Sequence, residues 1–382
     1  MSTVSVVNLK HNASASNNIV LDSSGNATFA GTAVPSSSFL RNRIINGDMR
    51  IDQRNAGAAT ANTISGYTVD RWAVFQSVTG KLIAQQNAGS VTPPSGFTNY
   101  LGVTSQSAYS VGSSDFYLID QRVEGFNVSD LGWGTASARP VTLSFWVRSS
   151  LTGTFGASLR NASENRSYPF TYTISAANTW EYKTVTIPGD TSGTWGTGNG
   201  IGIEILIGLG VGTTVSGTAG AWAGANYLGA TGATSVVGTN GATFYLTGVQ
   251  LEVGTAATPF ERRQYGQELA LCQRYAYAWG PGTQYVATYS SGLYSDANQI
   301  IMLPLGINVS GMRSLSATIT AVGTQGTDWL VQTAAGVNQT GFTLGWSGGV
   351  LFAVKAGHGI TNGNCNLQVV SSNGRIIVAT EL

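Results

Sequence analysis

The stretch Val141–Ser149, "VTLSFWVRS", alternates between two kinds of side chain. Every second residue from Val141 to Val147 is apolar and points to one side of an extended chain, whereas Trp146 and Arg148 point to the other. A period of two residues is typical of a β-strand that buries only one face. The stretch therefore predicts a strand with one side in a hydrophobic core.

Similar short runs recur from residue 42 to about residue 262, for example Asp115–Gly125 and Gly200–Gly210. Turn-forming Gly, Ser and Asn separate them, and Gly alone accounts for 50 of the 382 residues. About nine such runs over about 220 residues suit a sandwich of two sheets. The predicted fold class is therefore all-β, with a β-sandwich over residues 41–262.

Residues 263–279 break this pattern and predict a short linking helix. Apolar side chains recur there at the four-then-three spacing of a helix face. They are Tyr265, Leu269, Cys272, Ala276 and Trp279. Beyond them, residues 280–382 contain six or seven further strand-like runs, which predict a second, smaller β-sandwich.

Residues 1–40 are predicted to form a separate segment with a β-hairpin. Two short runs, Ile19–Leu21 and Ala27–Phe29, flank the turn-forming residues "DSSGN". A single hairpin is only marginally stable in water. We therefore expect it to pack against a partner chain, with "PSSSF" (residues 35–39) as a linker.

The composition excludes several functional classes. Charged residues make up only 10% of the chain, against roughly 25% in average domains, and the net charge is +1. A nucleic-acid partner is not expected, because duplex binders carry a clear basic excess. No run of about 20 apolar residues predicts a membrane span, and the first residues lack the pattern of a secretory signal.

The metal-ligating residue types are too sparse to predict a metal or cofactor. Cys272 and Cys365 lie far apart, and the two histidines, His11 and His358, lie near neither another histidine nor a CxxC pair. We expect both cysteines to be buried free thiols, since cysteine packs as a small hydrophobic residue.

Two charged stretches carry a family resemblance. They resemble tail-fibre and tail-spike-associated proteins of tailed bacteriophages. The first is "NRIINGDMRIDQR" (residues 42–54) with "YTVDRW" (67–72), and the second is "FYLTGVQLEVGTAATPFERRQYGQELALCQRY" (244–275). "SNNIVLDSSGNATFAGT" (16–32) is similar to the amino-terminal parts of phage fibre proteins. The unit also resembles jelly-roll carbohydrate-binding modules. Their acidic pair is absent from Thr247–Val249, so no structural calcium is expected.

The resemblance implies a virion protein, a phage tail fibre that forms a homotrimer. Residues 1–40 would attach it to the tail or baseplate, and residues 280–382 would form the tip that recognises host surface polysaccharide. The helix would pack at the threefold axis. Its inward residues would be Tyr265, Leu269, Cys272 and Ala276. The low charge also favours an oligomer, because open sheet edges invite association.

The resemblance also explains why charges concentrate in two places. The first and last strands of a jelly roll are neighbours, so Arg50, Asp52 and Arg54 could pair with charges near the end of the sandwich. Those charges are Glu252, Glu261, Arg262 and Arg263. The alternative is a solvated charged face, worth under about 1 kcal/mol per pair.

Catalysis is not predicted. The chain has no GxSxG and no HExxH motif. A glycosidase needs two carboxylates across a cleft, and the candidates are Asp115, Asp120, Glu124 and Glu164. Asp120 and Glu124 lie on one face of a predicted strand. Two alternatives stay open: a tailspike depolymerase that hydrolyses capsule or O-antigen, and a purely architectural baseplate component. No internal repeat predicts the β-helix of the former.

Glycan binding is the favoured function. Aromatic side chains offer rigid apolar faces to sugar rings, and loops on a rigid scaffold often carry binding residues. The candidates are Trp195, Trp222, Tyr227, Tyr285, Tyr289, Tyr294, Asp296 and Trp329. Each could instead pack back on its own domain. Aromatics within predicted strands, such as Phe145, are assigned to the core.

Overall fold

The computed structural model describes residues 41–60, 66–280 and 375–381 without a break. Elsewhere it describes the strands named below and a few single residues. Strands dominate, and the described part contains one α-helix. The predicted all-β class is confirmed.

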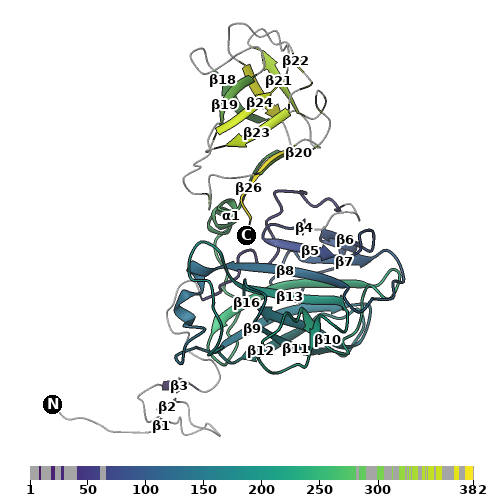
Figure 1. The fold of residues 1–382 in the computed structure, drawn as a ribbon, viewed down its shortest axis with the longest axis vertical. Coiled ribbons are helices and arrows are strands. Elements are labelled where there is room, and N and C mark those ends of the chain that lie inside the picture. Colours follow the sequence, from purple (N-terminus) through teal and green to yellow (C-terminus); the bar gives the residue numbers. More distant parts are fainter. Residues whose placement is uncertain are drawn as a thin grey trace, which may run out of the picture.

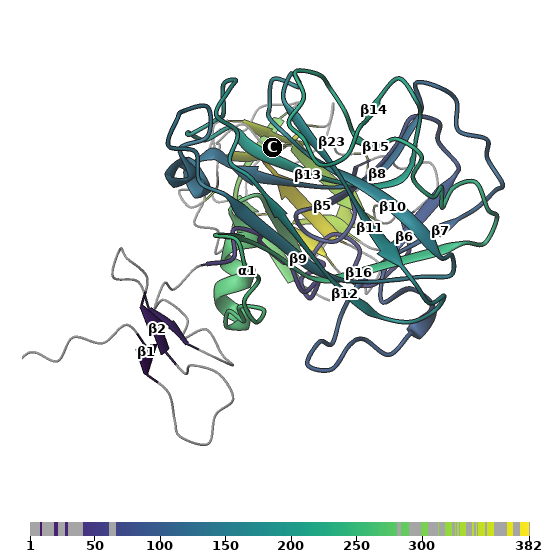
Figure 2. The ribbon, with the colours of Figure 1, turned by 90° about the horizontal axis from the view of Figure 1, so that it is seen from below.

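Two antiparallel sheets form the central sandwich, and Figures 1 and 2 show them stacked as two layers. The six-stranded sheet has the order β11–β10–β13–β8–β5–β4. Its strands are β4 (Gly66–Tyr67), β5 (Trp72–Gln76), β8 (Phe116–Glu124), β10 (Gly153–Arg160), β11 (Ser167–Ile174) and β13 (Ile201–Val211). A short parallel pair, β14 (Ser216–Gly217) and β15 (Gly229–Ala230), accompanies it.

The five-stranded sheet has the order β12–β9–β16–β7–β6. Its strands are β6 (Leu82–Gln86), β7 (Leu101–Ser105), β9 (Val141–Ser149), β12 (Glu181–Ile187) and β16 (Thr243–Val253). Short 3₁₀ turns occur at Ala88–Ser90, Gly125–Asn127 and Ser129–Leu131.

The core lies between these two sheets. Val141, Leu143, Phe145 and Val147 of β9 are completely buried, as the alternation predicts. They pack with the inward residues of β8 and β13 in one continuous hydrophobic cluster. The other face of β9, with Trp146 and Arg148, lies on the outer side of the five-stranded sheet.

Residues 42–57 do not form the first strand that the resemblance implied. Asn46 and Met49 have φ angles of 58° and 59°, a left-handed conformation that makes turns. The Asn46 side chain closes the loop by accepting a hydrogen bond from the Ile51 N–H and donating one to the Ile51 carbonyl. This loop nevertheless lies beside the last strand of the sandwich, as predicted for the first strand. Backbone hydrogen bonds join Arg43 to Leu251 and Val249 to Gly47.

The helix is shorter than predicted. α1 spans Tyr265–Gln273, and the chain then enters strand β17 (Ala276–Trp279). β17 pairs with β26 (Arg375–Ala379), which also pairs with β20 (Thr318–Val322). Pairing with a strand from the far end of the sequence overrides the helical spacing of residues 276–279. In Figure 1, α1 and β26 lie between the sandwich and the more distal strands.

Seven strands in the remainder form a separate sheet, in the order β22–β21–β25–β18–β19–β24–β23. They are β18 (Gln284–Tyr289), β19 (Gln299–Pro304), β21 (Trp329–Thr333), β22 (Asn338–Gln339), β23 (Thr343–Ser347), β24 (Val350–Val354) and β25 (Cys365–Val369). Most runs predicted from the sequence coincide with these strands.

The predicted amino-terminal hairpin is present. β2 (Ile19–Leu21) pairs with β3 (Ala27–Phe29) so that Ile19 faces Phe29, and β1 (Asn8–Leu9) adds a third strand. Among the described residues, no helix has the length and apolar character needed to span a membrane.

Candidate functional site

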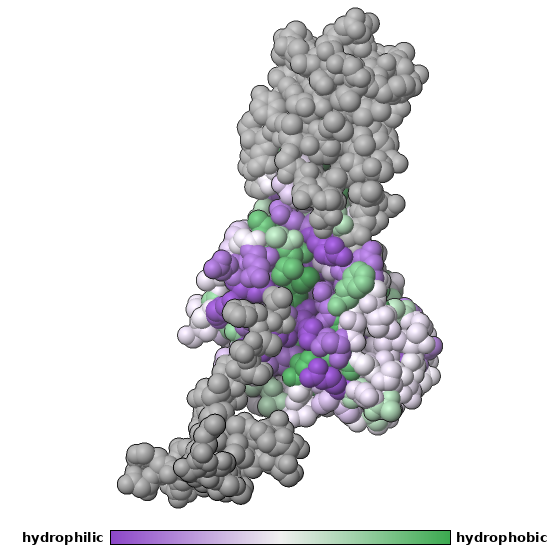
Figure 3. All heavy atoms as spheres, turned by 90° about the vertical axis from the view of Figure 1, so that its left-hand side faces the viewer, coloured by the Kyte–Doolittle hydropathy of each residue, from purple (hydrophilic) through white to green (hydrophobic). Residues whose placement is uncertain are grey.

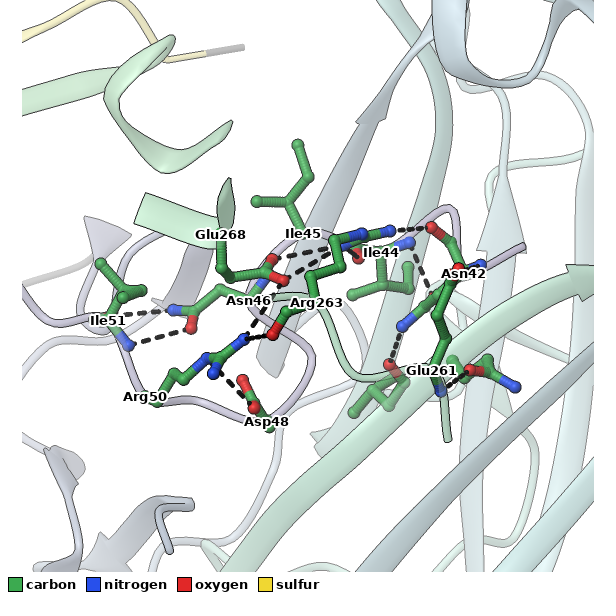
Figure 4. A network of polar contacts seen from close by, with 12 residues as sticks. Asn42, Ile44, Ile45, Asn46, Asp48, Arg50, Ile51, Glu261, Arg263 and Glu268 are labelled. Atoms are coloured by element: carbon green, nitrogen blue, oxygen red, sulfur yellow. Dashed lines mark hydrogen bonds and ion pairs between the residues drawn. The ribbon is translucent and has the colours of Figure 1, made fainter. Parts of the chain in front are cut away.

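A network of buried charges closes the base of the sandwich (Figure 4). Arg263 donates to the backbone carbonyls of Asn42 and Ile44 and pairs with Glu268 at 3.3 Å. Arg50 donates to the Arg263 carbonyl at 2.6 Å, and the Glu261 carboxylate accepts from the Asn42 N–H at 2.7 Å. The two charged stretches therefore hold each other together.

Two of the expected charges, Asp52 and Arg54, have other roles. Asp52 accepts from the N–H groups of Asn55 and Gly57 within its own loop. Arg54 pairs with Glu381 at 2.7 Å, and Glu381 also pairs with Arg71. The carboxyl end of the described chain thus returns to the base of the sandwich.

The outer face of the five-stranded sheet carries an aromatic groove. Trp146 of β9 lies directly across from Tyr182 of β12 in the strand register, and their ring centroids are 5.3 Å apart. Tyr182 is 43% exposed. Because neighbouring strands present side chains on one face in pairs, the sheet itself positions these two rings, whose planes are tilted by 46°.

Two loops complete the groove. Phe97 and Phe260 meet edge to face at 5.2 Å, and Arg262 lies over both rings. The resulting pocket has a volume of about 480 Å³. Its lining consists of Phe97, Trp146, Tyr182, Ala257, Thr258, Pro259, Phe260 and Arg262.

Glu252 holds the second of these loops against the sheet. Its carboxylate accepts hydrogen bonds from the Thr258 N–H and the Thr258 hydroxyl, at 2.8 and 2.7 Å. Gln250 accepts from the Glu261 N–H at 2.8 Å. Glu252 is only 3% exposed, so this buried acid fixes the loop rather than offering a charge to a ligand.

Gly248 lies under the groove, and its replacement by alanine should damage both the fold and the groove. Its φ of +62° disfavours any side chain, and a Cβ there would lie 2.7 Å from Phe97 and 3.1 Å from Trp146. We expect a loss of about 1–3 kcal/mol in unfolding free energy, measured by urea denaturation. The control is Gly241→Ala, which shares a positive φ (+74°) but has nothing within 4 Å. Equal losses in the two variants would contradict the collision.

Sequence reasoning missed this groove, although the signal was present. Trp146 occupies a position on the polar side of the alternating strand, whereas strand aromatics were assigned to the core. That assignment holds for Phe145, which is completely buried, but it is wrong for Trp146 and Tyr182. A large aromatic on the outward side of a strand was the useful indication.

Trp195 and Trp222 lie together, away from this groove. Their ring centroids are 5.4 Å apart, and both meet Trp133 edge to face. Trp195 is 8% exposed, and Trp222 donates its indole N–H to the Pro188 carbonyl. These two tryptophans therefore pack on their own domain, although Trp195 and Trp133 also line an apolar pocket of about 200 Å³.

The other glycan candidates do not join either group in the described structure. The Tyr227 ring lies so close to Gly217 that a Cβ there would be 2.2 Å from it. Trp329 is buried, at 7% exposure. Tyr285 and Tyr289 lie on β18, but their side chains, and all of Tyr294 and Asp296, lie outside the described residues.

The helix residues proposed for a threefold axis have mixed environments. Cys272 and Ala276 are each 1% exposed within a single chain, and Cys272 packs with Ile45, Ile51 and Tyr275. Burial inside the chain thus explains their spacing without a partner. Tyr265 is 58% exposed, and Leu269 is partly buried. The Cys272 thiol is free, as predicted.

The two carboxylates considered for catalysis are buried and bound by arginines. Glu124 accepts from Arg274 at 2.7 Å and from the Tyr275 hydroxyl at 2.5 Å. Arg122 lies 2.9 Å from Asp120 and 3.1 Å from Glu204. Neither Asp120 nor Glu124 lines either of the two pockets described above. Among the described residues, no group of three or more His, Cys, Asp or Glu is arranged to hold a metal ion.

Asp120 should make stability depend on pH. Burial, and then the nearby charge of Glu204, raise its pKa to about 7. A carboxyl group with a raised folded-state pKa stabilises the fold below about pH 4 and loses that contribution as the pH rises towards 7. We therefore expect Asp120→Asn to lessen the fall in unfolding free energy between about pH 5 and about pH 8, measured by urea denaturation. Identical slopes for the two proteins would contradict this.

Among known proteins, the chain is similar to several solved structures. No protein-family model matches the chain, and no curated protein matches it. Among solved structures, the enzymatically active domain of bacteriophage CBA120 tailspike protein 4 is similar, with a TM-score of 0.32 and 12% identity. The similarity covers 56% of this chain and 22% of the tailspike chain, so it spans less than a quarter of that protein.

Two carbohydrate-binding modules are also similar to the chain. The family 11 module from Clostridium thermocellum, in complex with a β-1,3-1,4-mixed-linked tetrasaccharide, has a TM-score of 0.26 and 13% identity over 52% of this chain and 96% of the module. TmCBM61, in complex with β-1,4-galactotriose, has a TM-score of 0.26 and 11% identity over 51% of this chain and 100% of the module.

Proposed function

We propose that this protein binds a glycan in the aromatic groove on the outer face of the five-stranded sheet, without cleaving it. The observation that carries the proposal is the pair of half-buried Trp146 and exposed Tyr182 in the lining of a 480 Å³ pocket. Exposed aromatic surface costs free energy in water and suits the apolar faces of sugar rings. No carboxylate belongs to the described lining, which favours binding over glycoside hydrolysis.

We further propose that the chain is a phage tail-fibre protein that adsorbs to host surface polysaccharide. This rests on the resemblance of its two charged stretches to that family, and on the way those stretches close one folded unit. Attachment to the tail or baseplate through residues 1–40, and a homotrimer, are part of the same proposal. Figure 3, seen from the left of Figure 1, shows apolar surface in separate patches among hydrophilic side chains.

The test is binding of the full-length protein to extracted host capsule and lipopolysaccharide, followed by tryptophan fluorescence and by the size of the polysaccharide over hours. We expect saturable binding, an unchanged polysaccharide size, and loss of binding in Tyr182→Ala. If Tyr182→Ala still binds the polysaccharide, the binding site would be assigned to residues 280–382 instead of the groove. Shortening of the polysaccharide would favour the depolymerase, and no binding at all would favour the architectural alternative.

A further inference from the structure

The aromatic groove contains a single charged group, which is positive. Seven of its eight lining residues are uncharged, and the eighth is Arg262. A second cation on the same face of the sheet, Arg148, lies over Tyr245 and donates to the Asn178 carbonyl. Glu252 is a buried acid behind the loop, and Thr258 and Gln250 occupy both of its carboxylate oxygens.

The guanidinium of Arg262, an exposed residue, lies against two aromatic rings. Its guanidinium carbon lies 4.6 Å from the centroid of Phe97 and 5.6 Å from that of Phe260. Such contacts fix the plane of the guanidinium while leaving the N–H groups at its edge available. The side chain is therefore oriented before any ligand arrives, which lowers the entropy lost on binding.

Arg262 has no protein partner for these donors among the described residues. Its neighbour Arg263 pairs with Glu268, whereas no hydrogen bond or ion pair joins Arg262 to a described side chain. Asp48 forms its ion pair with Arg50, at 3.3 Å. Burial raises the pKa of Asp48, and the Arg262 charge only partly opposes this rise. The adjacent Glu261 carboxylate accepts instead from the Asn42 N–H.

We propose that the groove selects an acidic glycan, whose carboxylate pairs with Arg262 while its sugar rings lie on Trp146 and Tyr182. The guanidinium fork matches a carboxylate with two parallel hydrogen bonds, and an unpaired cation in a partly apolar pocket favours an anion by charge complementarity. This inference rests on the proposed function and adds the chemical class of the ligand. Uronic acids and other carboxylate sugars are the class it names.

The test compares each acidic polysaccharide with its own carboxyl-reduced form, which keeps the backbone and removes the charge. Polygalacturonate, heparosan and polysialic acid serve as probes, together with any host polysaccharide that binds in the experiment above. For at least one pair, we expect full-length protein to bind the acidic form about tenfold or more tightly. That preference should weaken as sodium chloride rises.

Variants of Arg262 separate this inference from the proposed function. Arg262→Gln should bind the acidic and reduced forms about equally, and Arg262→Lys should be intermediate because it keeps the charge but lacks the fork. The matched control, Arg148→Gln, should change affinity less than about twofold, because Arg148 lies outside the pocket lining and donates to the Asn178 carbonyl.

The possible outcomes test the acidic-ligand inference and the proposed glycan binding separately. Equal affinity of the wild-type protein for both forms, or unchanged acidic binding by Arg262→Gln, would overturn the acidic-ligand inference and leave glycan binding intact. Absence of binding to every acidic and neutral polymer would overturn both claims together. Circular dichroism of each variant shows whether the fold is retained.

Discussion

Replacing Trp146 by alanine is expected to weaken glycan binding about 30-fold, equivalent to about 2 kcal/mol. The indole is the largest aromatic surface in the lining of the groove, and it lies between the Tyr182 ring and the loop that carries Phe97. The side chain points away from the core, so its removal should leave the sandwich intact. Titration of the full-length protein with the best-binding polysaccharide measures the change.

The matched control is Trp180→Ala. Trp180 also lies on the outer side of the sandwich, but it packs with Tyr100 and Tyr245 and does not line the groove. We expect this variant to bind within about twofold of the wild type, since contacts outside the central pocket contribute little. Equal losses in both variants would mean that any large aromatic on this face supports binding indirectly, which contradicts a specific site at Trp146.

Replacing Arg71 by alanine is expected to reduce the unfolding free energy by about 3–5 kcal/mol, the range for breaking one side of a buried ion pair. Arg71 is 1% exposed and pairs with Glu381. Its guanidinium also lies 3.6 Å from the centre of the Tyr275 ring and donates to the Arg122 carbonyl. Urea denaturation followed by tryptophan fluorescence measures the loss.

Arg139→Ala is the control for this loss. Arg139 pairs with Asp130 at 3.7 Å, and its side chain is 54% exposed, so the loss should stay under about 1 kcal/mol. Similar losses for Arg71 and Arg139 would show that the buried position contributes nothing special. A truncation after Gly280 would remove both Glu381 and β26, so it would also remove the ion-pair partner of Arg71.

The sequence alone predicted the elements whose side chains alternate regularly. β9 was recognisable because its apolar residues fall at every second position, and the pair β2–β3 because turn residues separate two short strand-like runs. These are local signals, set by one strand at a time. The two charged stretches also meet, as the resemblance implied, but the contacts differ from the predicted charge pairs: Arg50 donates to the Arg263 carbonyl, and Arg54 pairs with Glu381.

The two errors have different physical origins, because one depended on a contact between distant residues and the other on a turn within a few residues. Residues 276–279 continue a helical spacing, yet β26, about 100 residues later, pairs with them as a strand. Asn46 and Met49 look compatible with a strand, but the Asn46 side chain folds the chain into a loop. Nothing local to residues 276–279 indicates β26, whereas the partner of Asn46 is only five residues away.

The candidate site was missed for a related reason. Aromatics in glycine-rich loops were favoured as binding residues, but Trp195 and Trp222 find each other and Trp133 and so pack inward. The groove instead combines two strands with loops at Phe97 and Phe260, which are more than 150 residues apart in the sequence. Only the pairing of β9 with β12 and the anchoring of the loop by Glu252 bring these side chains together.

The most direct test of the account is a crystal structure of the full-length protein with an oligosaccharide from its best-binding polysaccharide. The account predicts sugar rings against Trp146 and Tyr182, with a carboxylate at Arg262. Sugar bound only at the Trp133–Trp195 pocket, or only within residues 280–382, would contradict it.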